Sequence, residues 1–288
     1  MRTLAALLAF LPGAALANPP SDAPAGPAAA AAAPRRAHTL SFGWSPRFMA
    51  RHDEIFSPRT TRGASALGLT LGHSWEGPRL SHHTRVDFSM AQASTQPAYE
   101  YLMWPRGEVY TTTPTPFTFV RVDHAALRRV ELPGRLTLHL GGAVDLDFQQ
   151  FDWVWHPFAL GGYAGIFGLD ARAELEADLG ARHRLRLGLS TPLLAWVARS
   201  PYSVTDTQLI WNNRENDPFR TIFRYIAGGT LRTLNQHQAL RMQVTYGYQV
   251  TPRLGLSLTA HGRVNHLTVP RPLLAQEWGL TLATRYAF

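Results

Sequence analysis

The sequence has no cysteine, no lysine and no long apolar run. Without cysteine the fold cannot depend on disulfides, which is compatible with an exported protein. A helix that spans a bilayer needs about 18 or more consecutive apolar residues, and no stretch beyond residue 17 supplies them. Any role in a membrane must therefore come from strands.

All 28 basic residues are arginines, and together with 20 acidic residues they give a net charge of +8. A positive balance can indicate binding to nucleic acid or to an anionic surface. Here the arginines are scattered through segments of alternating polarity, and no nucleic-acid-binding motif is present. We therefore expect no nucleic-acid partner and favour the anionic head groups of lipids.

Apolar and polar residues alternate in segment after segment from about residue 38 to the carboxy terminus. In the last segment Trp278, Tyr286 and Phe288 share one face with leucines, whereas the intervening residues are small or polar. Successive side chains of a strand point to opposite faces, so the pattern predicts strands with one apolar and one polar wall. Ten strands are predicted, over residues 39–49, 63–75, 80–91, 117–131, 136–149, 162–179, 184–189, 240–248, 254–260 and 276–288.

The turn at residues 180–182 fixes the pairing of its two strands. Its length keeps both apolar sets on one side, and it places Asp178 opposite Arg184 and Glu176 opposite Arg186. Pro192 shifts the parity of the second strand, which predicts a β-bulge or the approach to the outer rim.

Short and long connections alternate along the predicted strands. Connections after the even-numbered strands take three or four residues, and those after the odd-numbered strands are longer. A barrel that crosses a membrane up and down has short periplasmic turns and long extracellular loops. A soluble β-sandwich or lipocalin-like barrel is the alternative, but it gives no reason for this sorting. We predict an all-β fold, an antiparallel up-and-down transmembrane barrel over residues 38–288.

The amino-terminal residues are predicted to lie outside the barrel. Residues 1–17 are organised as a secretory signal peptide, with Arg2, an apolar core and the small-x-small sequence 15–17. Residues 18–37 are rich in proline and alanine, which predicts a disordered periplasmic leader. Its alanine run could instead form a short helix inside the lumen, but the flanking prolines disfavour a helix.

From about residue 39 onwards the chain resembles bacterial outer-membrane β-barrel proteins as a class, with a signal peptide, an even strand number and alternating walls. The resemblance implies that the terminal aromatics Trp278, Tyr286 and Phe288 form the signal read by the barrel-assembly machinery. It also implies an outer-membrane location and contact with outer-membrane lipids. We expect a monomeric barrel.

Charged residues gather on the wall that the alternation turns toward the lumen. They could line a selective pore for small solutes, or they could pair with one another and fill a narrow interior. Barrels of eight strands are filled by side chains whereas those of 16 to 18 strands leave a channel, so ten strands favour a filled lumen. The predicted lumen charges are Arg85, Asp87, Asp145, Asp147, Glu174, Glu176, Arg184 and Arg186.

No catalytic site stands out in the sequence. Ser81, His82 and His83 are adjacent, but alternation sends His82 to lipid and His83 inward, at the periplasmic end of a strand. His139 lies at the same end, and no serine or aspartate accompanies the histidine in 235–238. The aspartate and histidine pattern of the ten-stranded omptin proteases is not apparent. We expect no cofactor and no metal.

Aromatic residues in the predicted loops have the composition of recognition surfaces. They equally suit loops near lipopolysaccharide that have no specific partner. The candidates for interaction with envelope proteins are Tyr99, Tyr101, Trp104, Trp153, Trp155 and Trp211.

The sequence therefore favours a non-enzymatic structural or interaction component of an envelope assembly. Two alternatives stay open, a narrow channel for small solutes and a lipid or peptide hydrolase that acts at the outer rim. Which solute, substrate or protein partner is involved cannot be inferred from the sequence.

Overall fold

A computed structural model describes residues 37–55, 57–95, 100–103, 107–111, 114–153, 160–200 and 217–288. The predicted signal peptide at 1–17 and nearly all of the leader at 18–37 lie outside these residues and stay predictions. Among the described residues, no helix has the length and apolar character needed to cross a membrane.

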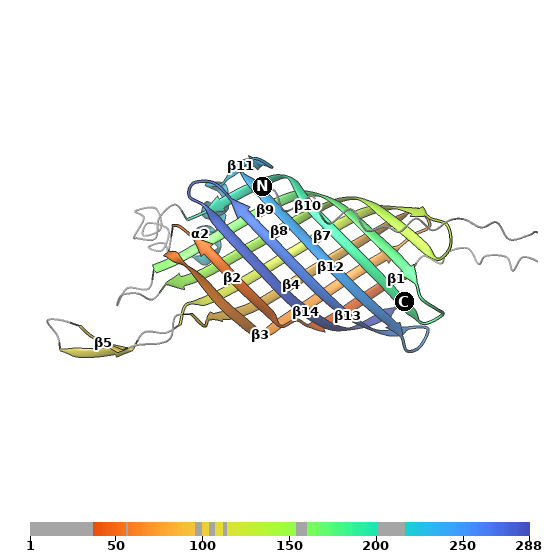
Figure 1. Ribbon diagram of the computed structural model, residues 1–288, viewed down its shortest axis with the longest axis horizontal. Coiled ribbons are helices and arrows are strands. Elements are labelled where there is room, and N and C mark those ends of the chain that lie inside the picture. Colours follow the sequence, from red (N-terminus) through yellow and green to blue (C-terminus); the bar gives the residue numbers. More distant parts are fainter. Residues whose placement is uncertain are drawn as a thin grey trace, which may run out of the picture. The chain divides into compact units, whose positions relative to one another are not determined.

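The described chain forms a closed antiparallel barrel with ten strand positions in its wall, here called staves (Figure 1). Two staves are interrupted: β1 and β2 both pair with β3 and β14, and β11 and β12 both pair with β10. The staves are β1 (Ala37–Trp44) with β2 (Arg47–Asp53), β3 (Ser57–Glu76), β4 (Leu80–Ala93), β7 (Pro116–Glu131), β8 (Leu136–Trp153), β9 (Leu160–Asp178), β10 (His183–Arg199), β11 (Thr230–Thr233) with β12 (His237–Gln249), β13 (Leu254–Leu267) and β14 (Leu273–Ala287).

The last stave closes the barrel against the first. Thr39 pairs with Ala287 and Arg47 with Gly279, in one continuous register. The backbones of His38 and Phe288 exchange two hydrogen bonds, at 3.3 and 3.0 Å. The predicted closure is thereby confirmed, and both ends of the described wall lie at the same end of the barrel.

The outer wall of the barrel is apolar because one residue in two along each stave is a large hydrophobic side chain that no other part of the chain covers. Phe42, Leu69, Val144 and Leu282 are between 50% and 57% exposed. Every backbone polar group in a closed barrel finds a partner within the wall, which is what a bilayer demands. This wall is therefore built to face lipid.

Aromatic side chains mark both edges of the apolar band. Phe48 and Trp278, which pair with each other, are exposed on the loop-end side of the wall, and Tyr286 and Phe288 are exposed at the opposite end. Amphipathic rings prefer the boundary between lipid and water, so two such belts are typical of membrane barrels.

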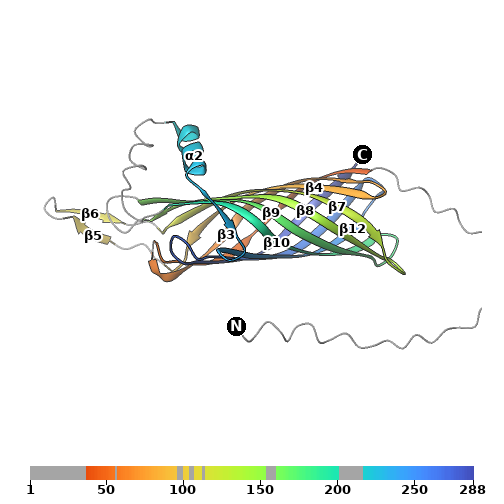
Figure 2. The ribbon, with the colours of Figure 1, turned by 90° about the horizontal axis from the view of Figure 1, so that it is seen from above.

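Four tight turns lie at the end where the chain closes, here called the turn end. They comprise residues 77–79, 132–135, 179–182 and 250–253. The opposite end is the loop end, where helix α2 (Pro218–Ala227) and the hairpin of β5 (Glu100–Met103) and β6 (Glu108–Thr111) also lie (Figure 2). In outer-membrane barrels the turn end faces the periplasm.

Several predicted connections are wrong in detail. The loop after the first stave was expected to be long, but it comprises only residues 54–56, and the loop before β14 shrinks to 268–272. The stretch 92–115 contains the hairpin, and the stretch 199–224 contains most of α2. The eighth stave begins at Thr230, well upstream of the predicted range 240–248.

Most staves extend further toward the loop end than predicted, and on β8 and β13 a large apolar side chain faces inward in the extension. Phe117, Phe151 and Leu267 point into the lumen and are almost completely buried. Alternation disappears wherever both faces of a strand are covered by apolar surroundings. On these staves the alternation of apolar and polar residues therefore ends before the strand ends.

Register was predicted more accurately than strand length. Arg184 lies opposite Asp178 and Arg186 opposite Glu176, as expected, and the register shifts between Pro192 and Leu194. The bulge at Pro192 is thus confirmed.

Candidate functional site in the barrel lumen

All eight predicted lumen charges lie on the inner wall of the barrel, and each makes an ion pair there. Their partners include several charged residues that the sequence analysis did not single out. Strand parity could have placed these residues in the lumen, although it could not have named their partners. The direct partners are Arg47, Glu76, Arg121, Arg172, Arg241 and Arg263, and these arginines pair in turn with Asp123, Asp170 and Glu277.

The middle of the lumen is crossed by a layer of buried ion pairs. Arg121 on β7 donates to Asp147 on β8 at 3.0 Å and, across the lumen, to both carboxylate oxygens of Glu277 on β14. Arg47 also donates to Glu277, at 3.1 Å, and Arg263 lies 2.9 Å from Asp147. Asp147 has no exposed surface. We call these five residues the central ion layer.

A second group of ion pairs continues the layer along the wall. Asp145 accepts from Arg241 at 2.5 Å and from Arg263 at 3.3 Å. Arg241 also donates to Asp170, which accepts a hydrogen bond from Ser190 at 2.7 Å. The strands themselves hold these groups in place, because each side chain points inward from a rigid, fully paired stave.

Closer to the turn end the ion pairs become accessible to water. Arg186 donates to Glu76 at 3.0 Å and to Glu176, and Arg184 donates to Asp178 at 3.2 Å. The side chains of Arg184 and Asp178 are 39% and 54% exposed. The lumen is therefore open to solvent at its turn end and shut at the central ion layer.

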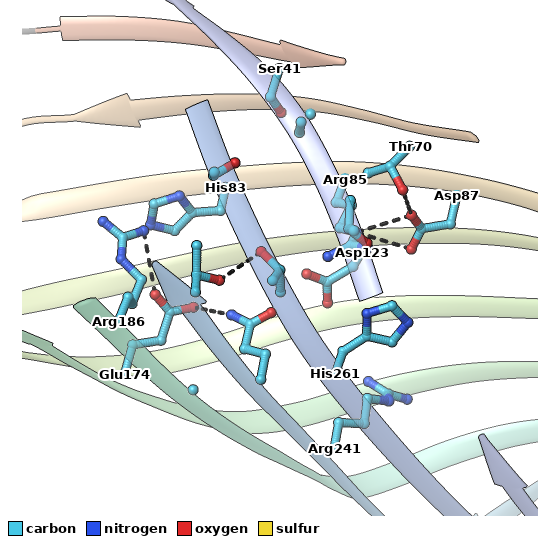
Figure 3. Close-up of a pocket in the computed structure, with 18 of the residues that line it drawn as sticks. Ser41, Thr70, His83, Arg85, Asp87, Asp123, Glu174, Arg186, Arg241 and His261 are labelled. Atoms are coloured by element: carbon cyan, nitrogen blue, oxygen red, sulfur yellow. Dashed lines mark hydrogen bonds and ion pairs between the residues drawn. The ribbon is translucent and has the colours of Figure 1, made fainter. Parts of the chain in front are cut away.

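Between these two levels lies a cavity of about 260 Å³. Polar and charged side chains from most staves line it, as Figure 3 shows for His83, Arg85, Glu174 and His261. A polar cavity of this size holds water, since each water molecule needs only about 30 Å³. The turn half of the lumen is thus a hydrated well.

On the loop side of the central ion layer the lumen is packed with apolar side chains. One cluster contains Met49, Phe117, Phe119 and Phe151 from β2, β7 and β8. Phe117 and Leu267 have no exposed surface although both point into the lumen. An inward-facing side chain can be hidden from water only if the lumen is filled at that level. The second cluster comprises Ile166, Ala195, Val197, Leu267 and Leu273.

A buried triad ties this apolar region together. Asp53 accepts from Arg51 at 2.7 Å and from Arg199, and the Arg51 guanidinium lies 4.5 Å from the centre of the Phe151 ring. The guanidinium groups of Arg51 and Arg199 both bind the Asp53 carboxylate, which links β2 to β10 across the lumen.

The structure brings together one serine and one histidine that the sequence analysis considered separately. Ser81 Oγ lies 3.3 Å from His139 Nδ1, which is hydrogen-bonding distance for a nucleophile and its base. Both side chains are almost completely buried, at 2% and 4% exposure, and neither lines the cavity. No substrate can reach the pair, so its role is to satisfy two buried polar groups.

Among the described residues, neither the predicted assembly-signal residues nor the loop aromatics line the lumen cavity. Trp278, Tyr286 and Phe288 are between 49% and 64% exposed on the outer wall. Tyr101 lies in β5 and Trp153 ends β8, without a described side chain. Tyr99, Trp104, Trp155 and Trp211 lie outside the described residues.

No arrangement for a metal was found in the part of the chain that the structure describes: no three His, Asp or Glu side chains there could hold an ion. The loop end offers one histidine–carboxylate pair among the described residues, His52 with Glu54 at 3.9 Å.

Comparison with known proteins identifies the architecture alone. No protein-family model matches the chain, and no curated protein sequence does. Among solved structures, the outer membrane protease OmpT of Escherichia coli matches with a TM-score of 0.51 and 10% identity, over 88% of this chain and 97% of that one. Neisserial surface protein A covers the same share of this chain and 99% of its own, at 10% identity and a TM-score of 0.36.

The fold is that of a bacterial outer-membrane β-barrel. The apolar exterior, the two aromatic belts and the closed ten-stave wall define this class, and the match to OmpT supports it. Its lumen has a hydrated well at the turn end and a packed plug at the loop end.

Proposed function

We propose that the protein is a non-conducting outer-membrane barrel that serves as a structural or interaction component of the envelope. The packed loop half of the lumen is the observation that supports this role. Inward-facing Phe117 and Leu267 have no exposed surface, and the central ion layer beneath them is almost as well buried. A solute that entered the well would first reach the central ion layer, whose buried side chains leave no room between them, and then the apolar clusters.

The channel alternative would require this plug to move. Opening would separate Arg121 from Glu277 and expose inward-facing phenylalanines to water. Separating a buried ion pair costs several kcal/mol, and hydrating each apolar side chain costs about 1.5–3 kcal/mol more. Nothing in the described loop half supplies a hinge for such a change, because its staves are paired on both sides.

The hydrolase alternative has one observation in its favour, the shared fold with a protein described as an outer membrane protease. Fold alone does not carry an activity, because unrelated functions occur on one scaffold. At the loop end, His52 lies on the outer face of β2, between the inward-facing Arg51 and Asp53, and its partner Glu54 follows the strand in the turn. A water-activating site needs both groups to converge on a substrate pocket.

Site-specific photo-cross-linking in intact cells tests the proposed role. A photoreactive residue would replace Tyr101 in the hairpin or Arg135 at the turn end, with lipid-facing Leu69 as the matched control. Discrete protein adducts at either of the first two positions, absent at Leu69, are expected for an interaction component. Absence of protein adducts at both positions, combined with cleavage of peptide or lipid substrates by the purified protein, would favour the hydrolase instead.

A further inference from the structure

The four turns at the turn end share one residue type at one position. Each turn ends in an arginine directly before the first residue of the next stave: Arg79 precedes Leu80, Arg135 precedes Leu136, Arg182 precedes His183 and Arg253 precedes Leu254. The surrounding residues differ from turn to turn, so turn geometry does not demand arginine. We call these four residues the turn arginines.

Backbone hydrogen bonds hold all four turn arginines in the same place relative to the wall. The carbonyl of each accepts from an amide of the neighbouring stave: Arg79 from Arg129 at 2.8 Å, Arg135 from Asp178 at 3.1 Å. The corresponding donors to Arg182 and Arg253 are Gln249 and Ala287, both at 2.8 Å. The backbone of each turn arginine is therefore fixed to the neighbouring stave at the last residue of the turn.

Strand parity turns these arginines toward the mouth of the lumen. Leu80, Leu136 and Leu254, the residues that follow them, face lipid and are exposed. Neighbouring residues of a strand point to opposite faces, so the turn arginines start on the lumen side. Lipid head groups lie on the other side of the wall, which makes them the less suitable partner.

The turn arginines are exposed and not neutralised within the described chain. None of the four forms an ion pair with a described residue, and all four are solvent-exposed. The acidic groups nearby have other partners: Glu76 pairs with Arg184 and Arg186, Asp178 with Arg184, and the exposed Glu131 lies 3.9 Å from Arg129. An unneutralised ring of cations at a rim attracts an external anion.

The size of the mouth excludes a small anion as the shared ligand of the ring. Ten staves spaced about 4.8 Å apart and tilted by about 40° enclose a barrel about 20 Å wide. Two staves separate one turn arginine from the next, or roughly 13 Å along the rim. Only an extended polyanion can contact all four.

Carboxylates of a polypeptide fit this spacing. The arginine fork binds a carboxylate through two parallel hydrogen bonds, and four residues of extended chain span about 13 Å. The chain's own leader does not fit, since residues 18–36 contain one acidic residue, Asp22, and two arginines. We infer that the turn arginines form a docking ring for an acidic polypeptide segment at the periplasmic mouth of the barrel. This inference rests on the proposed interaction role and specifies the chemistry of its partner.

A fluorescently labelled peptide of twelve residues, alternating Glu and Asp with Gly, is the probe, because it spans about 40 Å when extended. Binding to the full-length barrel in non-ionic detergent would be measured by fluorescence anisotropy. The R79Q/R135Q/R182Q/R253Q variant should bind about 16-fold more weakly, since each of the four exposed charge pairs contributes roughly two-fold. The same peptide with Gln and Asn in place of Glu and Asp should not bind, and added salt should weaken binding.

The control separates a ring from a merely positive protein. R62Q/R271Q removes two exposed arginines at the loop end, whereas R135Q/R182Q removes two from the ring. Affinity should fall about four-fold in the second variant and stay unchanged in the first. Equal losses in both, no binding by the wild type, or ring-dependent retention of phosphatidylglycerol without ring-dependent peptide binding would each overturn the docking ring.

The docking ring and the proposed function can fail separately. A barrel that conducts ions but binds the peptide through the turn arginines contradicts the non-conducting role and leaves the ring standing. If the barrel conducts no ions and gives protein cross-links in the envelope but does not bind the peptide, the docking ring is wrong and the proposed function is not affected.

Discussion

Replacing Arg121 with alanine should destabilise the barrel far more than replacing Arg184. Arg121 is almost completely buried and neutralises Asp147 and Glu277 together. Arg184 makes three ion pairs, but its side chain is 39% exposed at the water-filled turn end. The comparison therefore tests burial and not the number of ion pairs.

The magnitude follows from what remains after each substitution. Removing one partner of a buried pair costs about 3–5 kcal/mol, because a charge is left uncompensated. After Arg121→Ala, Glu277 keeps Arg47 at 3.1 Å and Asp147 keeps Arg263 at 2.9 Å, so we expect the lower limit, about 3 kcal/mol. Exposed pairs contribute about 0–1 kcal/mol, and Arg184→Ala should cost about 0.5 kcal/mol.

Reversible urea unfolding in lipid vesicles, followed by tryptophan fluorescence, provides the free energies, provided that the slope against urea is equal for all variants. The double variant R121A/E277Q should be more stable than the sum of its single variants implies, by about 1 kcal/mol or more, because the two residues are in contact. Equal losses for Arg121→Ala and Arg184→Ala, both below about 1 kcal/mol, would mean that water fills the lumen at the central ion layer.

Two further predictions concern the wall and its assembly. A methyl group on Gly141 would lie 2.1 Å from the backbone oxygen of Ala126, whereas one on Gly142 would lie 3.6 Å from its nearest neighbour. Gly141→Ala should therefore cost about 1–3 kcal/mol in the same urea assay, and Gly142→Ala should be nearly neutral; the reverse order would refute the wall geometry. Deleting Phe288 should impair membrane assembly in cells, measured as heat-modifiable barrel in isolated outer membranes, if the terminal aromatic is the assembly signal. Normal assembly without Phe288 would disprove that role.

The sequence predicted the parts of the barrel where the two faces of a strand meet different surroundings. Leu185 and Leu187 face lipid while Arg184 and Arg186 face the water-filled well, so alternation identified the strand and its pairing with Asp178 and Glu176. In the loop half, inward-facing residues such as Phe117, Phe151 and Leu267 are apolar like the outward-facing ones, and strands there extend beyond their predicted ends. Alternation in the sequence reveals a strand only where its two faces differ in polarity. Where the lumen is packed with apolar side chains, the two faces no longer differ.

Partners across the lumen could not be predicted, because closure of the wall decides them. Arg121 and Glu277 are 156 positions apart and meet only because β7 and β14 stand on opposite sides of the barrel. Helix α2 was missed although it carries a start signal, Asp217 before Pro218, and the Asp217 carboxylate accepts from the Arg220 amide at 3.0 Å. That signal was hidden within a stretch assigned to a loop.

Conductance across a planar bilayer tests the closed lumen most directly. The wild-type protein, shown to be inserted by its heat-modifiable mobility, should give a flat current trace at modest voltage, because Phe117, Leu267 and the central ion layer fill the lumen. Reproducible unitary current steps from the inserted wild type would contradict the plug and, with it, the non-conducting role.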